Sequence, residues 1–180
     1  MGIKINVICG LFSILLLGGC AHNNVSAPMT VVEQNDQVVA ELTSLGIEAE
    51  KTERGVTIYL PPNINFEENK SDINLRARSK IAEISRELNK DYLAHRNIEV
   101  SGHTNSNGES EDNLNLSKNR AQAAAEELVF SNVLLSRITV TWHGEEQPRF
   151  PEFDEQGNLI VKNQDFNRRV EFIVLDPNAN

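Results

Sequence analysis

The sequence predicts a two-layer α+β sandwich in which one β-sheet carries helices on a single face. Three observations predict this fold: segments with apolar residues at helical spacing, short runs rich in β-branched residues, and the alternation of the two along the chain. Strands separated by helices need crossover connections, and right-handed crossovers place the helices on the same face of the sheet.

The amino-terminal residues 1–19 have the pattern of a secretory signal. A short start carrying Lys4 precedes an apolar run at residues 7–17, which is too short to span a membrane. The signal leads into Leu-Gly-Gly-Cys at residues 17–20, which resembles the bacterial lipobox. We therefore expect cleavage before Cys20 and acylation of this cysteine, which would anchor the chain to a membrane. An ordinary cleaved signal with an incidental cysteine is the alternative.

The next predicted elements are a tether, a helix and a hairpin. Residues 20–30 have no apolar period and contain a proline, so we expect a flexible tether that starts at the lipidated cysteine. A helix is predicted from Val31 to a stop at Gly46, and strands at residues 47–51 and 56–60 flank a turn. The apolar face of this helix is predicted to contain Val31, Val38, Leu42 and Leu45.

Two further helices alternate with three strands. Asp72 or Asn74 can cap the first of these helices, and the second is expected to begin near Asn113. The acidic residues 145–163 are predicted to form a solvated insertion. Strands are predicted at residues 98–101, 138–142 and 170–175. The predicted apolar stripes are Ala77, Ile81, Ile84 and Leu88, then Leu114, Ala121, Ala124 and Leu128.

The net charge limits the classes of partner. The chain of 180 residues carries a formal charge of -9, which disfavours nucleic acid or anionic lipid as a partner bound by bulk charge. An anionic ligand must therefore be bound by local groups.

A polar loop between a strand and a helix is the candidate site. Residues 101–121 read SGHTNSNGESEDNLNLSKNRA, with Gly102 ending a strand. Ligands favour such a strand end, because the following helix presents free N–H groups and positive partial charge. Arg120 lies in the second turn of the predicted helix, and helical side chains lean toward the amino terminus, so its guanidinium should face the loop and suit a carboxylate. The alternative is that Arg120 pins the loop by pairing with Glu109, Glu111 or Asp112.

Motifs along this region agree with one family in order and spacing. They are Gly102-His103-Thr104, Gly108, Asn113, Leu116-Ser117, Arg120-Ala121, Gly144, Pro148 and Asn167-Arg168-Arg169-Val170-Glu171. Together they resemble the OmpA-like peptidoglycan-binding domain, from near Ile64-Asn65-Phe66 to about Leu175. The resemblance implies a βαβαβ core with a mixed sheet, here preceded by the additional helix and hairpin. The predicted organisation is a signal at 1–19, an anchor and tether at 20–30, a helix and hairpin at 31–62, the OmpA-like domain at 63–176 and a tail at 177–180.

The resemblance also implies a ligand. Family members bind the meso-diaminopimelate of the peptidoglycan stem peptide, whose side chain ends in a carboxylate and an ammonium on one carbon. In the family pattern GHTD...N..LS..RA, the arginine holds the carboxylate and the aspartate holds the ammonium. By this pattern Arg120 would hold the carboxylate, Asn113 would assist, and Arg168 is a candidate second wall contact. Thr104 and Leu116 lie in the matching motifs and are included in the implied site.

Asn105 stands where the family pattern has aspartate. An amide accepts a hydrogen bond from an ammonium but lacks the negative charge, so binding could weaken by about tenfold or more. Three interpretations remain open. Glu109, Glu111 or Asp112 could supply the charge to a weakened site. The wall component could be chemically altered, for example amidated. Or the domain could have lost wall binding and serve as a scaffold for another envelope protein.

Other polar and aromatic residues carry weaker signals. Ser117 is expected to bond the backbone near the helix start, and Arg169 to be either a wall contact or an ion-pair partner in the sheet. His103 and His143 each follow a strand, and we predict structural roles for them rather than a metal site. Trp142 is predicted in the core or at the edge of the pocket.

No catalytic residue or cofactor is predicted. The acids of the loop are expected to be exposed, with nothing to raise the pKa of one of them. The alternative to a binding protein is an enzyme that hydrolyses the cell wall.

The residue after the lipobox cysteine indicates a location. Ala21, rather than an aspartate, resembles the sorting pattern of outer-membrane lipoproteins in enteric bacteria. We expect a protein anchored in the outer membrane and facing the periplasm. Its expected partners are peptidoglycan, the membrane through the lipid, and either an envelope protein or a second copy that contacts residues 31–62.

Overall fold

The computed structural model describes residues 27–60 and 71–178. The predicted signal, Cys20 and most of the tether lie outside these residues, as does the start of the family resemblance at Ile64-Asn65-Phe66.

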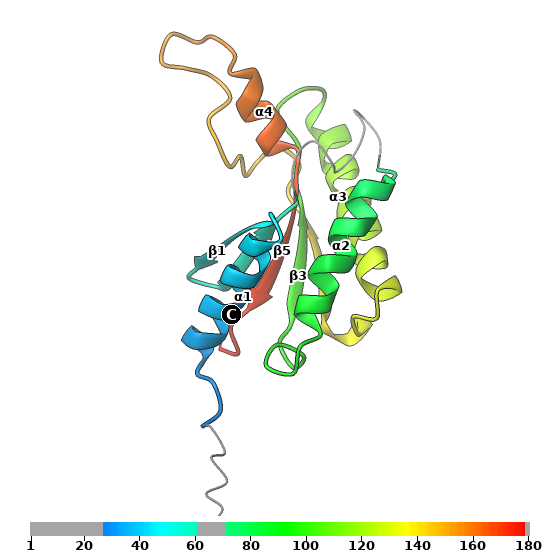
Figure 1. The fold of residues 1–180 in the computed structure, drawn as a ribbon. Helices are drawn as coiled ribbons and strands as arrows, with labels where there is room; N and C mark the ends of the chain where they lie inside the picture. The colour runs from blue at the N-terminus through cyan, green and yellow to red at the C-terminus, as the bar shows by residue number, and fades with distance from the viewer. Residues whose placement is uncertain (1–26, 61–70, 179–180) are drawn as a thin grey trace, which may run out of the picture.

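One mixed sheet forms the centre of the molecule (Figure 1). Its strands are β1 (Glu48–Thr52), β2 (Gly55–Tyr59), β3 (Ile98–Gly102), β4 (Ile138–Trp142) and β5 (Val170–Leu175). They are arranged in the order β1-β2-β5-β3-β4, with β3 and β4 parallel and the other neighbours antiparallel. The predicted hairpin therefore adds two strands to the sheet of the core domain.

Three helices of the described residues cover one face of the sheet. They are α1 (Val31–Ser44), α2 (Leu75–Leu88) and α3 (Ser110–Phe130). The Thr30 hydroxyl accepts a hydrogen bond from the Glu33 N–H at the start of α1, and Asn74 Oδ1 accepts one from the Ala77 N–H at the start of α2. Asn74, rather than Asp72, is thus the cap of α2. The predicted two-layer α+β fold with helices on one face is confirmed.

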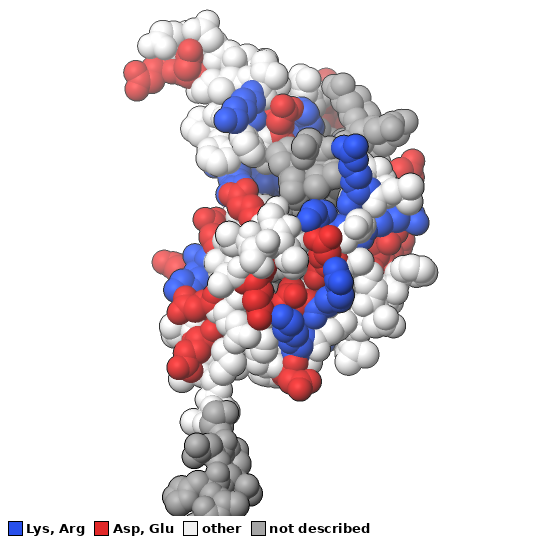
Figure 2. Space-filling view, viewed as in Figure 1, with Lys and Arg blue, Asp and Glu red and all other residues white. Residues whose placement is uncertain are grey.

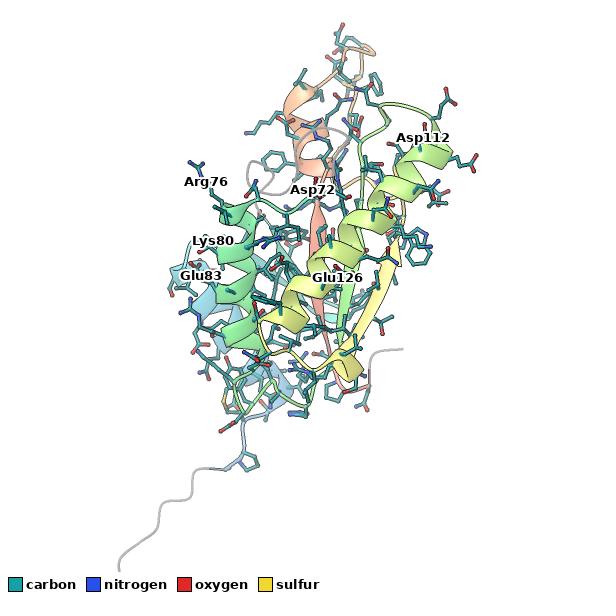
Figure 3. All side chains as sticks on the ribbon, turned by 90° about the vertical axis from the view of Figure 1, so that its right-hand side faces the viewer. Asp72, Arg76, Lys80, Glu83, Asp112 and Glu126 are labelled. Carbon is teal, nitrogen blue, oxygen red and sulfur yellow. The ribbon has the colours of Figure 1, made fainter. Side chains whose placement is uncertain are left out.

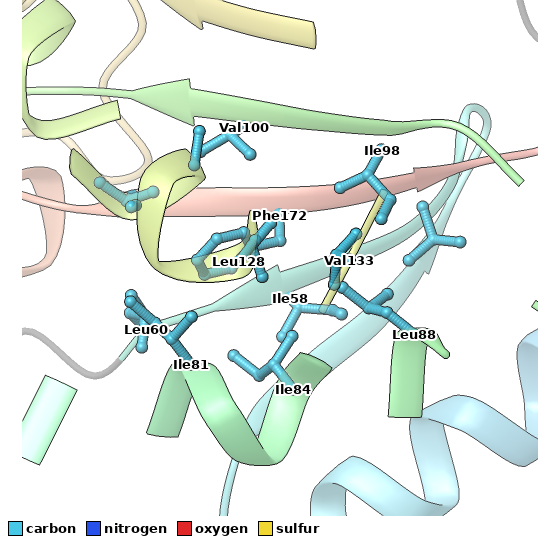
Figure 4. Packing of buried hydrophobic residues seen from close by; sticks show 14 of the residues in the cluster. Ile58, Leu60, Ile81, Ile84, Leu88, Ile98, Val100, Leu128, Val133 and Phe172 are labelled. Atoms are coloured by element: carbon cyan, nitrogen blue, oxygen red, sulfur yellow. The ribbon is translucent and has the colours of Figure 1, made fainter. Parts of the chain in front are cut away.

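A single hydrophobic core joins the helices to the sheet (Figure 4). Alternate residues of the central strands point into it, including Ile58 of β2, Val100 of β3 and Phe172 of β5, and all three are fully buried. Ile81 and Ile84 of α2 pack against them, as the predicted stripe requires. On the outer side of α2, Figure 3 shows Arg76, Lys80 and Glu83.

The opposite face of the sheet is polar and held by ion pairs. Arg54 forms two hydrogen bonds with the carboxylate of Glu99, at 3.1 and 2.6 Å. Arg169 Nε lies 2.6 Å from Glu171 Oε1, which confirms the ion-pair role considered for Arg169. Across the surface seen in Figure 2, acidic and basic side chains are interspersed.

Arg96 fastens α1 to the end of the chain. Its guanidinium is fully buried and donates to Asn35 Oδ1 of α1 at 2.6 Å and to Asp176 Oδ1 at 2.5 Å. It also donates to the Leu175 carbonyl at 2.9 Å. These bonds satisfy a charge that would be costly to bury alone, and they make α1 part of the same packed unit as β5.

Several sequence expectations differ in detail from the structure. Helix α3 begins at Ser110, three residues before Asn113, because Glu111 and Asp112 in its first turn favour the positive end of the helix. Leu114 and Leu45 are 42% and 39% exposed, so neither belongs to the buried face predicted for it. The face of α3 that points inward is polar in its first half, where the helix extends beyond the core.

The predicted solvated insertion is only partly solvated. It leads into α4 (Val161–Asn167), which rises beyond one end of the sheet in Figure 1. An isolated bridge pairs Phe153 with Leu159, and the preceding residue, Glu152, is buried. The acidic composition of the segment did not indicate that Glu152 is buried, because the partners of its carboxylate lie far away in the sequence.

The close approach of β3 and α3 at Gly102 predicts a large effect of substitution. A Cβ at this position would lie 2.1 Å from the Ser117 carbonyl oxygen, so α3 would have to move. Gly102→Ala should lower the free energy of unfolding by about 3 kcal/mol in a denaturant titration. Gly46→Ala is the matched control, because a Cβ there meets nothing within 4 Å. It should cost only about 1 kcal/mol, from its left-handed backbone. Equal effects of the two substitutions would contradict the proposed crowding.

Candidate functional site

A cavity of about 120 Å³ opens at the end of the sheet where β3 and β4 finish and β5 begins. All six residues predicted to bind the ligand line this cavity. Two residues of the same loop that were not predicted as ligand contacts, Asn107 and Gly108, also line it. The described lining residues are Thr104, Asn105, Asn107, Gly108, Asn113, Leu116, Arg120 and Arg168.

Backbone contacts fix the loop against the start of α3. The Thr104 N–H donates to the Gly144 carbonyl at 2.8 Å, and the Gly144 N–H donates to the Ser117 hydroxyl at 3.0 Å. The same hydroxyl donates to the Leu114 carbonyl at 2.8 Å, which confirms the backbone-bonding role predicted for Ser117. Gly144 has a φ of +53°, so a glycine fits this tight connection best.

Arg120 brings a positive charge into the cavity wall. It lies about three turns into α3, rather than in the second turn, and only 2% of the residue is exposed. Burial, and then the nearby charge of Arg168, lower the pKa of Arg120 to about 10. The guanidinium is therefore still charged at neutral pH and suits an anionic ligand.

Glu109, Glu111 and Asp112 do not line the cavity. All three are exposed, and Figure 3 shows Asp112 at the outer end of α3. The expectation that one of them supplies charge to the site gains no support from their positions.

Two polar groups of the loop have unused hydrogen-bonding capacity. The Thr104 hydroxyl is buried and has no hydrogen-bond partner among the described residues. Asn105 is 5% exposed, and its side chain makes no hydrogen bond within the described part of the chain. Buried polar atoms are normally satisfied, so both groups are candidates for ligand contacts.

Two further polar lining residues, Asn113 and Arg168, each have a carboxylate neighbour. Asn113 Nδ2 donates a short hydrogen bond to Glu145 Oε2. Arg168 pairs with Asp165, one turn earlier in α4, and about a third of its side chain is exposed. Arg168 is thus placed at the rim of the cavity and Arg120 in its interior.

Glu152 holds the loop that follows β3 in position through Ser106. The sequence did not predict this role. Its carboxylate accepts hydrogen bonds from the Ser106 N–H at 3.1 Å and the Ser106 hydroxyl at 2.7 Å. It also accepts from Gln164 Nε2 at 3.1 Å and Asn167 Nδ2 at 2.8 Å. Burial alone would raise the pKa of Glu152, but these hydrogen bonds outweigh burial and lower it. No local pattern links Glu152 to Ser106, which lies 46 positions away.

The two histidines stack beside the site. The His103 and His143 rings lie 5.1 Å apart, and His103 Nε2 is 3.1 Å from the Ser101 hydroxyl. Burial and the charges of Arg169 and His143 lower the pKa of His103 to about 2, so the ring is neutral. Within residues 27–60 and 71–178, no group of three potential metal ligands gathers.

Trp142 lies in neither place predicted for it. The residue is 38% exposed on the edge strand β4, and Lys118 Nζ lies 4.9 Å from the ring centroid. The alternation of Trp142 with Val140 correctly placed it on a strand. Among the described strands, however, β4 is at the edge of the sheet, with none beyond it to bury this side chain.

A two-layer sandwich with a cavity at the strand ends describes a binding domain, and comparison with known proteins gives its family. Residues 65–158 match the model of the OmpA family, and the chain belongs to this family. The predicted resemblance is confirmed. Membership supports association with peptidoglycan and agrees with the prediction of a protein that is not an enzyme.

Individual relatives match over different lengths. The peptidoglycan-associated lipoprotein of Mesorhizobium japonicum is 28% identical over 144 residues, which cover 79% of each chain. Outer membrane porin F of Pseudomonas fluorescens is 40% identical over 75 residues, 42% of this chain and 21% of the porin. A protein of Gloeobacter violaceus named photosystem I P700 chlorophyll a apoprotein A2 is 29% identical over 147 residues, 82% of this chain. The chain spans only 16% of that protein.

Solved structures agree with the fold. The periplasmic domain of MotB from Helicobacter pylori has a TM-score of 0.62 and 25% identity, with 74% of this chain and 84% of that chain covered. An outer membrane protein of Borrelia burgdorferi has a TM-score of 0.55 and 28% identity, with 72% and 97% covered. The relatives and neighbours support a place in the cell envelope. None of the helices in the described residues has the length and apolar character needed to cross a membrane.

Loss of the Glu152 charge should destabilise the loop in a pH-dependent way. Because the folded pKa is lowered, the carboxylate contributes its full stability above about pH 4.5 and loses it as the pH falls through the lower folded value. Glu152→Gln should cost about 2 kcal/mol at pH 7, measured by chemical denaturation, because hydrogen bonds to a charged acceptor are lost. The difference from the wild type should shrink below pH 4.5.

Glu155→Gln is the control, because this residue is exposed in the same segment. It should change stability by less than about 0.5 kcal/mol. A constant Glu152→Gln effect from pH 7 to pH 3 would contradict the role given to the carboxylate.

Proposed function

We propose that the chain binds peptidoglycan noncovalently through the diaminopimelate of the stem peptide and tethers the outer membrane to the wall. The observation that supports this most is the buried guanidinium of Arg120 in the wall of a cavity at the strand ends. A planar guanidinium can grip a carboxylate through two parallel hydrogen bonds, which gives both affinity and orientation.

The other lining residues have compatible roles. Thr104 can donate its unused hydroxyl hydrogen to the ligand carboxylate, and Asn113 and the loop backbone can hold its polar groups. Leu116 offers an apolar surface to the methylene chain of diaminopimelate. Arg168 at the rim can contact a second wall group, although its pairing with Asp165 lowers the energy available for that contact.

We propose that binding is weak because of Asn105. The family pattern places a carboxylate here, and an amide gives a neutral hydrogen bond that contributes about half as much as a charge-assisted one. The alternative function is an envelope scaffold that has lost wall binding. A shallow apolar groove between α3 and β4, lined by Val129, Leu135, Ile138 and Val140, favours that alternative.

Sedimentation with purified sacculi tests the proposed site. Asn105→Asp should increase the affinity for untreated sacculi by about tenfold, because it restores a charge-assisted bond to the free ammonium. Arg120→Ala should decrease whatever binding the wild type shows. Circular dichroism of both variants provides the control for folding. If both variants bind as the wild type does, the cavity is not the wall-binding site.

The proposed lipid anchor has its own test. Cells that express the chain should incorporate labelled palmitate into it, and Cys20→Ala should abolish the label, because the lipobox cysteine is the proposed acceptor. Fractionation should then move the protein from the outer membrane to the soluble periplasmic fraction. Labelling that survives the substitution would refute Cys20 as the site of acylation.

A further inference from the structure

Strand β4 lies at the edge of the described sheet but lacks the usual protection of an edge strand. It comes last in the order of the described strands, beyond β3. Edge strands often carry a charged residue or a proline that discourages another strand from pairing with them. The sequence of β4 is ITVTW, which has neither, and all of its residues favour strands. This edge is therefore suited to pairing with a further strand.

An apolar groove lies beside this edge, between α3 and β4. Ile138 and Val140 of β4 line it, together with Val129 and Leu135, whose side chains are exposed. Trp142 is exposed on the same face of the strand, because residues at alternate positions share a face. Apolar side chains that gather on a surface mark an interaction site. The occupant should therefore offer both a strand and apolar side chains.

A second copy of β4 meets both requirements. Antiparallel pairing about a two-fold axis at Val140 puts Trp142 of each copy opposite Ile138 of the other, on the face that carries α3. Because α3 contacts both β3 and β4, its axis lies roughly above the line between these strands. With strands about 4.8 Å apart, the axes of the two α3 helices then lie about 10 Å apart. This distance is at the upper end of the roughly 8–10 Å found for packed helices, so the two grooves close on each other.

The charges beside the groove are self-complementary in this arrangement. Lys118 Nζ lies 4.9 Å from the ring centroid of Trp142, at the end of β4, and Glu126 lines the groove with Ile138. The separation of Lys118 and Glu126 along α3 is about 12 Å, and that of Ile138 and Trp142 along β4 is about 13 Å. The two-fold axis at Val140 therefore places Lys118 of each copy opposite Glu126 of the other. Each dimer gains two such pairs of opposite charges.

We infer that β4 and the adjoining face of α3 form a dimer interface, on which a second copy of this chain pairs antiparallel through β4. The groove and the cavity at the strand ends share no described lining residue, so dimer formation and ligand binding can be tested separately. The interface lies at the opposite edge of the described sheet from β1. It therefore differs from the contact through residues 31–62 that the sequence suggested for a second copy.

Exchange of the two charges tests the interface. Sedimentation velocity of the full chain in detergent should show a monomer–dimer equilibrium. Lys118→Glu and Glu126→Lys should each weaken the dimer by about tenfold, because each puts two like-charge contacts across the two-fold axis. The double variant restores opposite charges and should recover the dissociation constant of the wild type. Glu111→Lys is the control for net charge, because this exposed residue of α3 does not line the groove, and it should leave the dimer unchanged.

Oxidation of cells that express cysteine variants tests the register. In the proposed pair, the Cα atoms of the two copies of residue 140 lie about 5 Å apart, within the range of a disulfide. Val140→Cys should therefore give a product of twice the mass on a non-reducing gel, which the wild type does not give. Ala49→Cys is the matched control, because Ala49 is also partly buried on an edge strand of the described sheet, and it should stay monomeric.

Three results would overturn the inference. The first is a wild type that stays monomeric, or a double charge variant that dimerises as weakly as the single variants. The second is a cross-linked dimer of Ala49→Cys without one of Val140→Cys, which would place the contact at the β1 edge. The third is a Val140→Cys product of a different mass, which would show that another protein, rather than a second copy, occupies this surface.

Discussion

The approach of α3 to the end of β3 is the constraint on which the site depends. Gly102 leaves no space for a side chain between the strand and the Ser117 carbonyl, and the Ser117 hydroxyl joins this contact to Gly144 at the end of β4. With the helix held there, its inward face carries Asn113 and Arg120 into the cavity wall instead of into the core. A buried guanidinium is costly unless polar groups surround it, so the rigid backbone contact and the polar loop are needed together.

The second half of the site depends on groups distant in sequence. Glu152 links the loop at Ser106 to α4 through Gln164 and Asn167, so the segment before β5 holds the same loop that follows β3. Arg168, at the end of α4, reaches the cavity because this segment folds back over the strand ends. The arrangement explains how the charged residues among the described lining are both arginines in a chain with a net charge of -9: Glu145, Glu152 and Asp165 lie nearby and hold parts of the wall in position.

The sequence predicted most of the fold, and the six residues that it predicted for the site all lie in the cavity wall. Apolar periodicity placed the five strands to within about a residue and found the buried stripe of α2, since those elements bury one face against a common core. Periodicity failed at Leu114 and Trp142, because it cannot tell where a helix extends beyond the sheet or which strand lies at an edge. It also could not find Glu152, whose partners come together only in the folded chain. The cavity residues were found through the motif spacing, which preserves the loop and the register of Arg120 even though α3 starts earlier than expected.

The central claim is that Arg120 holds the carboxylate of a diaminopimelate residue while Asn105 faces the neighbouring nitrogen. A crystal structure of the chain with a diaminopimelate-containing stem peptide tests this claim most directly. We expect two hydrogen bonds of about 2.8 Å from the Arg120 guanidinium to the carboxylate, and one from the neighbouring nitrogen of the ligand to Asn105 Oδ1. A ligand seated elsewhere, or one whose carboxylate contacts Arg168 and leaves Arg120 untouched, would contradict it.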